Sequence, residues 1–389
     1  MQPNEITFDM FINDKNIGIQ IARDIEFASW KKSPWEAFVG KGGDRAIRTF
    51  PVDSLEPCRP RLKTKLTGKG VQGNADFDTN YDELEILSQT IYPKVRGNAL
   101  LSPIEQYSKM RAIDFKAEVT ENLAEWVNDI RDRAFTTALI NDFTNIVVAD
   151  ATNGYKDTTA DKSVQQATKK IVAGDVVNVK MLRRAIFMAR TGLLYNGKEA
   201  FPIKPTRSEA VTEGGISVMN YSYVILLDSY GIHQLKQDPE WQDMQKYAGD
   251  RGDKNRIFTG LAGLIDGCPV IDMGVWTKMQ AGFLNSEVKD SEFYENIAKE
   301  NFTKLTPPST YAGTQPVSLG ALIGANALVM AGYDSVKFYV ERVDAGRKLK
   351  CAVDRTMAIA KGRFALEEGN LNVYSNQDYA TIGLAYSKE

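Results

Sequence analysis

The stretch from Gln245 to Asp272, QKYAGDRGDKNRIFTGLAGLIDGCPVID, is the part of the chain that says most about its fold. It contains five glycines, a polar first half and a short apolar run that ends at Val270-Ile271-Asp272. Glycine is the usual residue where a backbone must turn sharply, so the pattern predicts a long surface loop that returns into a strand. The stretch has no metal-ligand spacing, phosphate-binding loop or nucleophile elbow.

The whole chain has 389 residues, which is more than one compact core usually holds, so we expect two or three subdomains. Apolar residues make up 43% and charged residues 25%, an ordinary globular composition that argues against disorder. The net charge of −2 lacks the basic excess of a dedicated nucleic-acid-binding protein. A weak contact with nucleic acid at a local patch remains open.

The cysteine and histidine content restricts the chemistry further. The three cysteines, Cys58, Cys268 and Cys351, are far apart and fit neither a disulfide framework nor a metal site, which indicates free thiols in a reducing compartment. The single histidine, His233, excludes a zinc site with several histidine ligands. We see no secretion signal and no apolar stretch near the ~20 residues of a membrane span, so we expect an intracellular chain without a membrane contact.

The N-terminal third divides into an arm and a hairpin. Residues 1–57 carry short aromatic clusters without a long periodic segment, which predicts an extended arm. Its aromatic residues could pack on the same chain's core or across a subunit boundary, and the sequence favours neither. Residues 58–100 begin basic and glycine-rich and then alternate loosely, which predicts a projecting β-hairpin. The candidate strand positions in it are Leu84, Ile86, Ile91 and Val95.

A long helix follows the hairpin. Ser102-Pro103-Ile104-Glu105 has the features of a helix start, with Ser as N-cap and Pro in the first turn. Apolar residues then recur at helical spacing, so we predict a helix over Pro103–Ile140, roughly 55 Å long at about 1.5 Å per residue. We expect its buried stripe to contain Leu123, Trp126, Ile130 and Phe135.

The remaining elements are less regular. Residues 149–170 are polar and predict a loop. Further helices are expected at residues 179–190, with Gly192 at the end, at residues 240–247, and in a segment that begins at residue 232. Residues 318–330 are apolar and rich in small residues, so we expect a buried helix there. Strands are expected at residues 221–227, 336–343, 348–356 and 364–374, with a turn at 344–346.

No residue stands out as catalytic, cofactor-binding or metal-binding. Gly68–Gly73 matches G-x-G-x-x-G by letter, but no helix follows it. His233 has no nucleophile motif beside it, and Cys268 lies in an apolar strand, where a buried inert thiol is the usual case. The acid pairs Asp142/Asp150 and Asp250/Asp253 fit solvated turns. We therefore expect a protein that is not an enzyme and has no cofactor.

A basic cluster lies in the predicted hairpin, at Arg59, Arg61, Lys63, Lys65 and Lys69. These side chains could bind phosphate, or they could bind acidic residues of a neighbouring copy. The acidic residues Asp76 to Glu85 of the same hairpin slightly favour the second interpretation.

Three blocks of the chain resemble the phage N4-type family of tailed-phage major capsid proteins. The most specific covers residues 223–271, with the Lys-Tyr-Ala segment, the Ile-Phe-Thr-Gly block and the strand after it; the others are residues 66–73 and 114–126. The resemblance implies an α+β, HK97-like phage capsid fold. Its parts would be an N-terminal arm (1–57), an extended E-loop hairpin (58–100), a peripheral domain with the spine helix (101–175), an axial domain (176–335), and return strands of the peripheral domain with the C-terminus (336–389).

The same resemblance implies a function. The chain would be a major capsid protein that self-assembles into the icosahedral head shell around a phage double-stranded DNA genome, without catalysis. Its partners would be copies of itself in hexamers and pentamers, possible scaffold, portal and decoration proteins, and packaged DNA through weak nonspecific contact. It would be found in the virion after assembly in the host cytoplasm. The alternatives are an encapsulin-like nanocompartment shell protein of the same fold, and an enzyme with an unfamiliar site.

Overall fold

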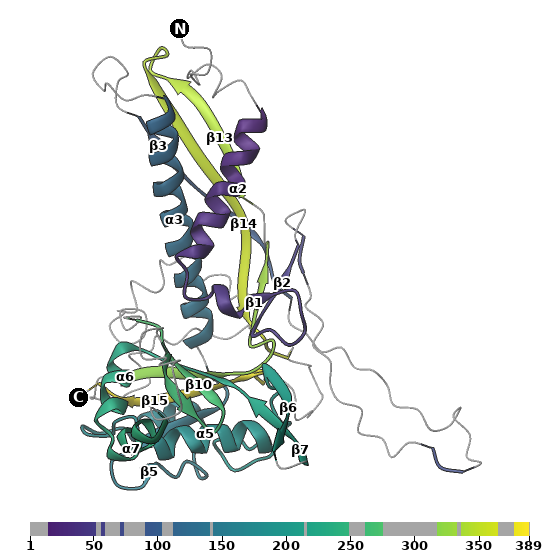
Figure 1. Cartoon of the computed structure of the whole chain (residues 1–389), viewed down its shortest axis with the longest axis vertical. Helices are drawn as coiled ribbons and strands as arrows, with labels where there is room; N and C mark the ends of the chain where they lie inside the picture. The colour runs from purple at the N-terminus through teal and green to yellow at the C-terminus, as the bar shows by residue number, and fades with distance from the viewer. Residues whose placement is uncertain are drawn as a thin grey trace.

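A computed structural model describes residues 15–51, 56–58, 71–73, 90–102, 112–140, 143–213, 216–248, 261–274, 317–332, 336–364 and 377–388. The described part combines a tall, narrow upper region with a broad lower region (Figure 1). Long strands and two helices form the upper region, and a second sheet with shorter helices forms the lower one.

The upper sheet is organised around one long strand. Its order is β1 (Val39–Gly40), β2 (Ile47–Phe50), β12 (Leu328–Ala331), β14 (Lys348–Lys361) and β13 (Val336–Val343), with β3 (Lys94–Leu101) also paired to β14. Strand β14 runs antiparallel to both β13 and β3. The predicted strands at residues 336–343 and 348–356 are confirmed, and β14 continues beyond the predicted end. Asp344, Ala345 and Gly346, with φ of 58°, 54° and 87°, form the predicted turn.

The base of the predicted hairpin is also present. Cys58 and Ile91 form an antiparallel bridge, and Val95 lies in β3. Leu84, Ile86 and the basic cluster from Arg59 to Lys69 lie outside the described residues.

The predicted spine helix is α3, described over Ala112–Ile140. Its 29 residues span about 43 Å at about 1.5 Å per residue. The predicted start at residues 102–105 is not tested, because 103–111 lie outside the described part. The predicted buried stripe was partly wrong: Leu123 and Phe135 are buried, but Trp126 and Ile130 are half-buried. The centre of the stripe runs instead through Val119, Leu123 and Val127, four residues apart.

Helix α2 (Lys15–Lys31) contradicts the predicted extended arm over these residues. Its Ile21 and Ile25 pack with α3 and with apolar residues of β14. The helix was missed because its inward face also carries polar residues, Glu26 and Ser29, which interrupt the apolar period. Phe8, Phe11 and Ile12 lie outside the described residues.

The chain after α2 turns into the core of the molecule. Trp30, Trp35 and Phe38, the last of these in the short 3₁₀ helix η1 (Glu36–Phe38), are buried in one cluster with Phe135 of α3. These three aromatic residues therefore pack on the core of their own chain and not across a subunit boundary. The cluster continues into the lower sheet, so one core joins the two regions.

The lower sheet has seven strands. Their order is β5 (Gly154–Tyr155), β4 (Ile146–Asp150), β15 (Thr381–Ser387), β11 (Val317–Ile323), β8 (Val224–Leu227), β10 (Cys268–Asp272) and β9 (Leu261–Ile265). Every residue of β8, β11 and β15 is buried. The predicted strands ending at residues 227 and 272 are confirmed, although Tyr221 and Ser222 belong to β7. Strand β15 was not predicted, and the strand predicted at 364–374 lies almost wholly outside the described residues.

The helix predicted at residues 318–330 is wrong, because this segment forms β11, a turn at Asn326 and β12. A strand buried on both faces shows no apolar–polar alternation, so its sequence can be mistaken for a buried helix. The small residues of this segment allow neighbouring strands and their side chains to pack closely. A Cβ on Gly320 would lie 2.6 Å from Leu227 Cδ2 of the neighbouring strand.

The helices of the lower region are α4 (Val164–Thr168), α5 (Val179–Thr191), α6 (Ser229–Gln237) and α7 (Pro239–Ala248). Helix α5 confirms the prediction for residues 179–190: Asn178 caps its start, and Gly192, with φ of 78°, ends it. Helices α6 and α7 are confirmed as well. The polar stretch 149–170, predicted as a loop, also contains β5 and α4.

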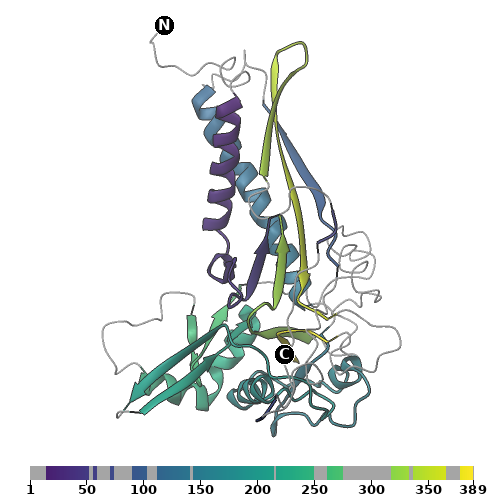
Figure 2. The ribbon, with the colours of Figure 1, turned by 90° about the vertical axis from the view of Figure 1, so that its right-hand side faces the viewer.

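Two further features complete the fold. The antiparallel hairpin of β6 (Arg207–Glu213) and β7 (Ile216–Ser222) forms a separate two-stranded sheet and projects sideways from the lower region (Figure 2). Strands β4 and β15, which are far apart in the sequence, both belong to the lower sheet.

Candidate assembly surfaces

The residues considered for chemistry in the sequence are not gathered into one site. His233 lies exposed on α6, with its Nε2 2.9 Å from Gln237 Nε2. Cys268 is buried in β10, where burial raises the pKa of its thiol. Of the acid pairs, Asp150 ends β4, whereas Asp142, Asp250 and Asp253 lie outside the described residues.

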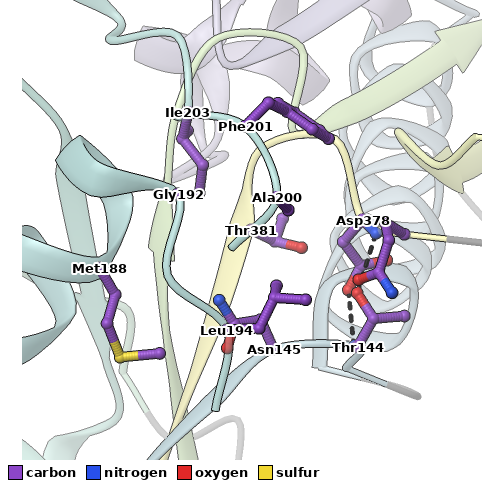
Figure 3. A pocket seen from close by; sticks show the side chains of 11 residues that line it. Thr144, Asn145, Met188, Gly192, Leu194, Ala200, Phe201, Ile203, Asp378 and Thr381 are labelled. Atoms are coloured by element: carbon purple, nitrogen blue, oxygen red, sulfur yellow. Dashed lines mark hydrogen bonds between the residues drawn. The ribbon is translucent and has the colours of Figure 1, made fainter. Parts of the chain in front are cut away.

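One small cavity lies between the loop after α3 and the start of β15 (Figure 3). Its volume is about 20 Å³, which is room for about one water molecule. Its lining includes Asn145, Phe201 and Thr381. This cavity is too small for an organic substrate.

The described residues contain neither a metal-binding cluster nor a membrane-spanning helix. In that part of the chain, no group of three or more His, Cys, Asp or Glu side chains could hold a metal ion. None of the described helices is long and apolar enough to cross a membrane.

A buried ion pair links the two sheets beside this cavity. Asp378 accepts a hydrogen bond from Arg363 Nε at 2.8 Å and another from the backbone N–H of Thr144 at 3.0 Å (Figure 3 shows Thr144 and Asp378). Lys361 Nζ lies 3.6 Å from the same carboxylate. Burial alone would raise the pKa of Asp378, but Arg363 and Lys361 hold it below its usual value. Because a buried charge without a partner is costly, this contact fixes the end of β14 against the lower sheet.

A second polar network attaches α2 to the upper sheet. Glu26 accepts hydrogen bonds from Arg355 Nη2 of β14 at 3.0 Å and from Trp30 Nε1 at 2.7 Å. Arg131 of α3 donates to the carbonyl oxygen of Ser29 at 2.8 Å, and its guanidinium lies 3.5 Å from the Trp30 ring centroid. Each of these polar residues therefore has a specific partner, although Glu26 Oε2, Arg131 Nε and two guanidinium nitrogens of Arg355 are buried without a hydrogen bond.

The same interface contains Asp132, an acidic side chain with a raised pKa. Asp132 of α3 accepts a hydrogen bond from Ser33 Oγ at 2.6 Å. Burial raises the pKa of Asp132 to about 6, although Ser33 and Arg131 act in the opposite direction. Asp132 therefore changes its charge near pH 6 at the junction of α2 and α3.

The upper sheet has one covered face and one open face. Helices α2 and α3 cover the first through a shared apolar cluster with Leu349, Cys351 and Val353 of β14. Alternate residues point away from these helices, and the strand register brings them together on the other face. We call this the open sheet face; it comprises Val95, Gly97, Ala99, Leu101, Lys337, Tyr339, Glu341, Lys350, Ala352, Asp354 and Thr356.

The open sheet face exposes three large apolar side chains to water. Val95 is 50% exposed, Leu101 51% and Tyr339 49%, and no described helix or strand covers them. In the register of the same face, Lys337 lies opposite Asp354, and Glu341 opposite Lys350. Lys350 and Asp354 lie on the central strand, so charged residues alternate with the apolar ones across this face. Exposed apolar side chains mixed with charged residues are a common composition of a surface that binds another protein.

Sequence reasoning did not identify the open sheet face. Only Val95 was singled out, as a strand position. The alternating apolar residues of Val336–Val343 were the available signal, but alternation alone does not show which strands lie beside them.

The long helix against a long antiparallel sheet, joined through one core to a broad mixed lower sheet, defines the chain as an HK97-like phage capsid fold. The capsid of Ralstonia phage GP4 shares this fold at 16% identity, with 92% of each chain covered and a TM-score of 0.59. At this identity the likeness shows the fold alone.

Closer relatives establish the family. Residues 57–385 match the phage capsid protein family. The "Major structural protein ORF14" of Helicobacter pylori bacteriophage KHP30 is 42% identical over 401 residues, covering 99% of this chain and 99% of that protein. The chain therefore belongs to the phage capsid protein family.

Two solved structures are similar over nearly the whole chain. The acid-stable capsid of Helicobacter pylori bacteriophage KHP30 has 40% identity and a TM-score of 0.73, with 99% of this chain and 100% of that one covered. The head of Helicobacter pylori bacteriophage KHP40 has 42% identity and a TM-score of 0.75, with the same coverage. The predicted α+β capsid fold and the predicted capsid function are confirmed, and they are favoured over the nanocompartment alternative.

Proposed function

We propose that this chain is the major subunit of an icosahedral phage head and assembles with copies of itself, as hexamers and pentamers, around a double-stranded DNA genome. The observation that carries this proposal is the near full-length similarity to proteins solved as a phage capsid and a phage head. The subunit acts as a building block of the virion without catalysis. Assembly takes place in the host cytoplasm, with scaffold, portal and decoration proteins as further possible partners.

The open sheet face supports this function by offering an interface to a neighbouring copy. A monomer would leave Val95, Leu101 and Tyr339 in water, whereas a packed subunit would bury them. The contact is heterologous, since this face meets a different surface of the neighbour, and heterologous contacts generate rings. The hairpin predicted at residues 58–100 is our candidate for that second surface.

The domain division follows the sheets under this proposal. The peripheral domain contains α2, α3 and the sheet built on β14. The axial domain contains the seven-stranded sheet, so it takes in residues 143–175 and 377–388 as well as most of 176–335.

The proposal is tested with two matched single substitutions. Leu101→Asp places a charge on the open sheet face, and Val172→Asp places the same charge on an exposed apolar residue of the lower region, 57% exposed. At exposed positions both should cost at most about 1 kcal/mol of folding stability. Circular dichroism checks the fold, and negative-stain electron microscopy checks assembly.

We expect the Val172→Asp protein to form shells like the parent and the Leu101→Asp protein to remain as folded subunits or small oligomers. Normal closed shells from Leu101→Asp would show that the open sheet face is not an interface. Absence of shells from the parent under all salt and scaffold conditions would contradict the proposed function itself.

A further inference from the structure

One segment of the lower region carries a local excess of positive charge. Residues 150–200 contain nine Lys or Arg and five Asp or Glu, a net charge of +4, whereas the whole chain carries −2. One of the five acids, Asp175, is buried and paired with Lys156 at 2.6 Å. This pair removes one charge of each sign, so the rest of the segment still carries a net charge of +4.

Helix α5 provides the centre of this basic surface. Lys180, Arg184 and Phe187 follow one another at spacings of four and three residues, so they share one side of the helix. The Arg184 guanidinium lies 5.0 Å from the ring centroid of Tyr155 and 5.5 Å from that of Phe187. Both rings remain accessible, Phe187 at 50% and Tyr155 at 37%. Lys180 belongs to the same surface, because a Cβ on Gly154 would lie 2.6 Å from Lys180 Cβ.

More cations surround this group, which we call the basic α5 face (Tyr155, Lys180, Arg184 and Phe187). The loop of residues 156–170 packs beside the turn at 194–198, since Thr158 Oγ1 donates to the carbonyl oxygen of Tyr195 at 2.7 Å. This loop and turn add exposed lysines at 162, 169, 170 and 198. Two acids lie in the same loop. Asp161 pairs with Lys170 at 2.8 Å, and the pKa of Asp157 is lowered by hydrogen bonds from Thr159 and by nearby Lys170 and Arg184.

The other two arginines of α5, Arg183 and Arg190, already have hydrogen-bond partners within the chain. Arg183 Nη1 is 2.5 Å from Glu240 Oε1, and Arg190 Nη2 donates to the carbonyl oxygens of Tyr221 and Asp266. In the described part of the chain, Lys180 and Arg184 have no carboxylate within ion-pair distance. They remain available for an external anion.

We propose that the basic α5 face is a nucleic-acid contact of the subunit, with Lys180 and Arg184 binding backbone phosphates. The proposal rests on the proposed function, in which the shell encloses a polyanion. Lysine and arginine side chains without internal partners match phosphates through charge, and the Tyr155 and Phe187 rings position the Arg184 guanidinium beside Lys180. A protein partner is less well matched, because the exposed rings are separate and lack the contiguous apolar centre of a protein interface.

The test compares two double substitutions that each remove two positive charges. Lys180→Gln with Arg184→Gln alters the basic α5 face, and Arg23→Gln with Lys31→Gln alters exposed residues of α2 as the matched control. Binding to a labelled duplex of about 40 base pairs is measured by fluorescence anisotropy over a range of salt concentrations. The slope of log K against log salt is negative, and each lost phosphate contact reduces its magnitude by about 0.9. The slope of the α5 variant should therefore be smaller in magnitude than that of the parent by about 1.8.

We expect the α5 variant to bind more weakly with this smaller slope, and the α2 control to match the parent. An unchanged slope, equal loss in the control, or no binding by the parent at low salt would overturn the proposal. Shell formation is scored in the same preparations by electron microscopy. If the α5 variant lost shells but kept its DNA slope, the face would bind an acidic surface of a neighbouring copy, and the proposal would be wrong. A parent that bound DNA but formed no shells would contradict only the proposed function.

Discussion

Phe135 offers the sharpest test of how the spine helix joins the two regions. Its side chain is fully buried near the C-terminal end of α3, with its ring centroid 5.5 Å from that of Trp35 and 6.4 Å from that of Trp30. The same cluster includes residues of the lower sheet. Phe135 therefore lies where α2, α3 and the lower sheet meet.

Replacing Phe135 by Ala removes this ring and leaves a cavity that rigid neighbours cannot close. Such changes cost about 3–5 kcal/mol, and the two aromatic contacts place this site in the upper part of that range. Trp126 is the matched comparison, because it is a larger aromatic residue on the same helix but is only half-buried. Trp126→Ala should cost less than about half as much, since part of its surface already contacts water.

The measurement is urea unfolding of the unassembled subunit, followed by tryptophan fluorescence and circular dichroism. Assembled shells must be absent, because subunit contacts add to the apparent stability. A cost below about 1 kcal/mol for Phe135→Ala, or a larger cost for Trp126→Ala, would refute the described packing of the spine helix.

Two further predictions concern titration and backbone strain. Burial raises the pKa of Asp132 to about 6, so its ionised form is penalised in the folded state above that pH. The free energy of unfolding should therefore rise by about 1 kcal/mol from this group between pH 7 and pH 5, and Asp132→Asn should lose this rise; an equal pH dependence in the variant would contradict the assignment. Gly332 and Gly174 have nearly equal φ, 89° and 88°, but a Cβ would clash with the Thr356 carbonyl only at Gly332. Gly174→Ala should cost about 1–2 kcal/mol from backbone strain alone and Gly332→Ala clearly more, and equal thermal stability of the two variants would disprove the close approach of β12 and β14.

Elements with local signals were predictable from the sequence. Helix α5 has an Asn cap, an apolar stripe and a terminal glycine, and all three lie within fifteen residues of each other. The turn between β13 and β14 was predictable for the same reason, because the Asp-Ala-Gly sequence suits residues with positive φ.

The errors arose where tertiary contacts decide the structure. Helix α2 was missed because Glu26 faces inward, and its partner Arg355 lies 329 residues away in the sequence. The segment of β11 and β12 was taken for a helix because both its faces are buried. The open sheet face could not be assembled from the sequence, since Leu101 and Tyr339 come together only through their separate pairing with β14.

The central claim is that this subunit builds a closed shell through its open sheet face. The most direct test is cryo-electron microscopy of the purified chain at high concentration, with and without a scaffold protein from the same phage. We predict icosahedral shells or capsomer rings in which Val95, Leu101 and Tyr339 of each subunit are buried against a neighbouring copy. A monodisperse monomer under all conditions, or shells in which this face contacts only solvent, would contradict the account.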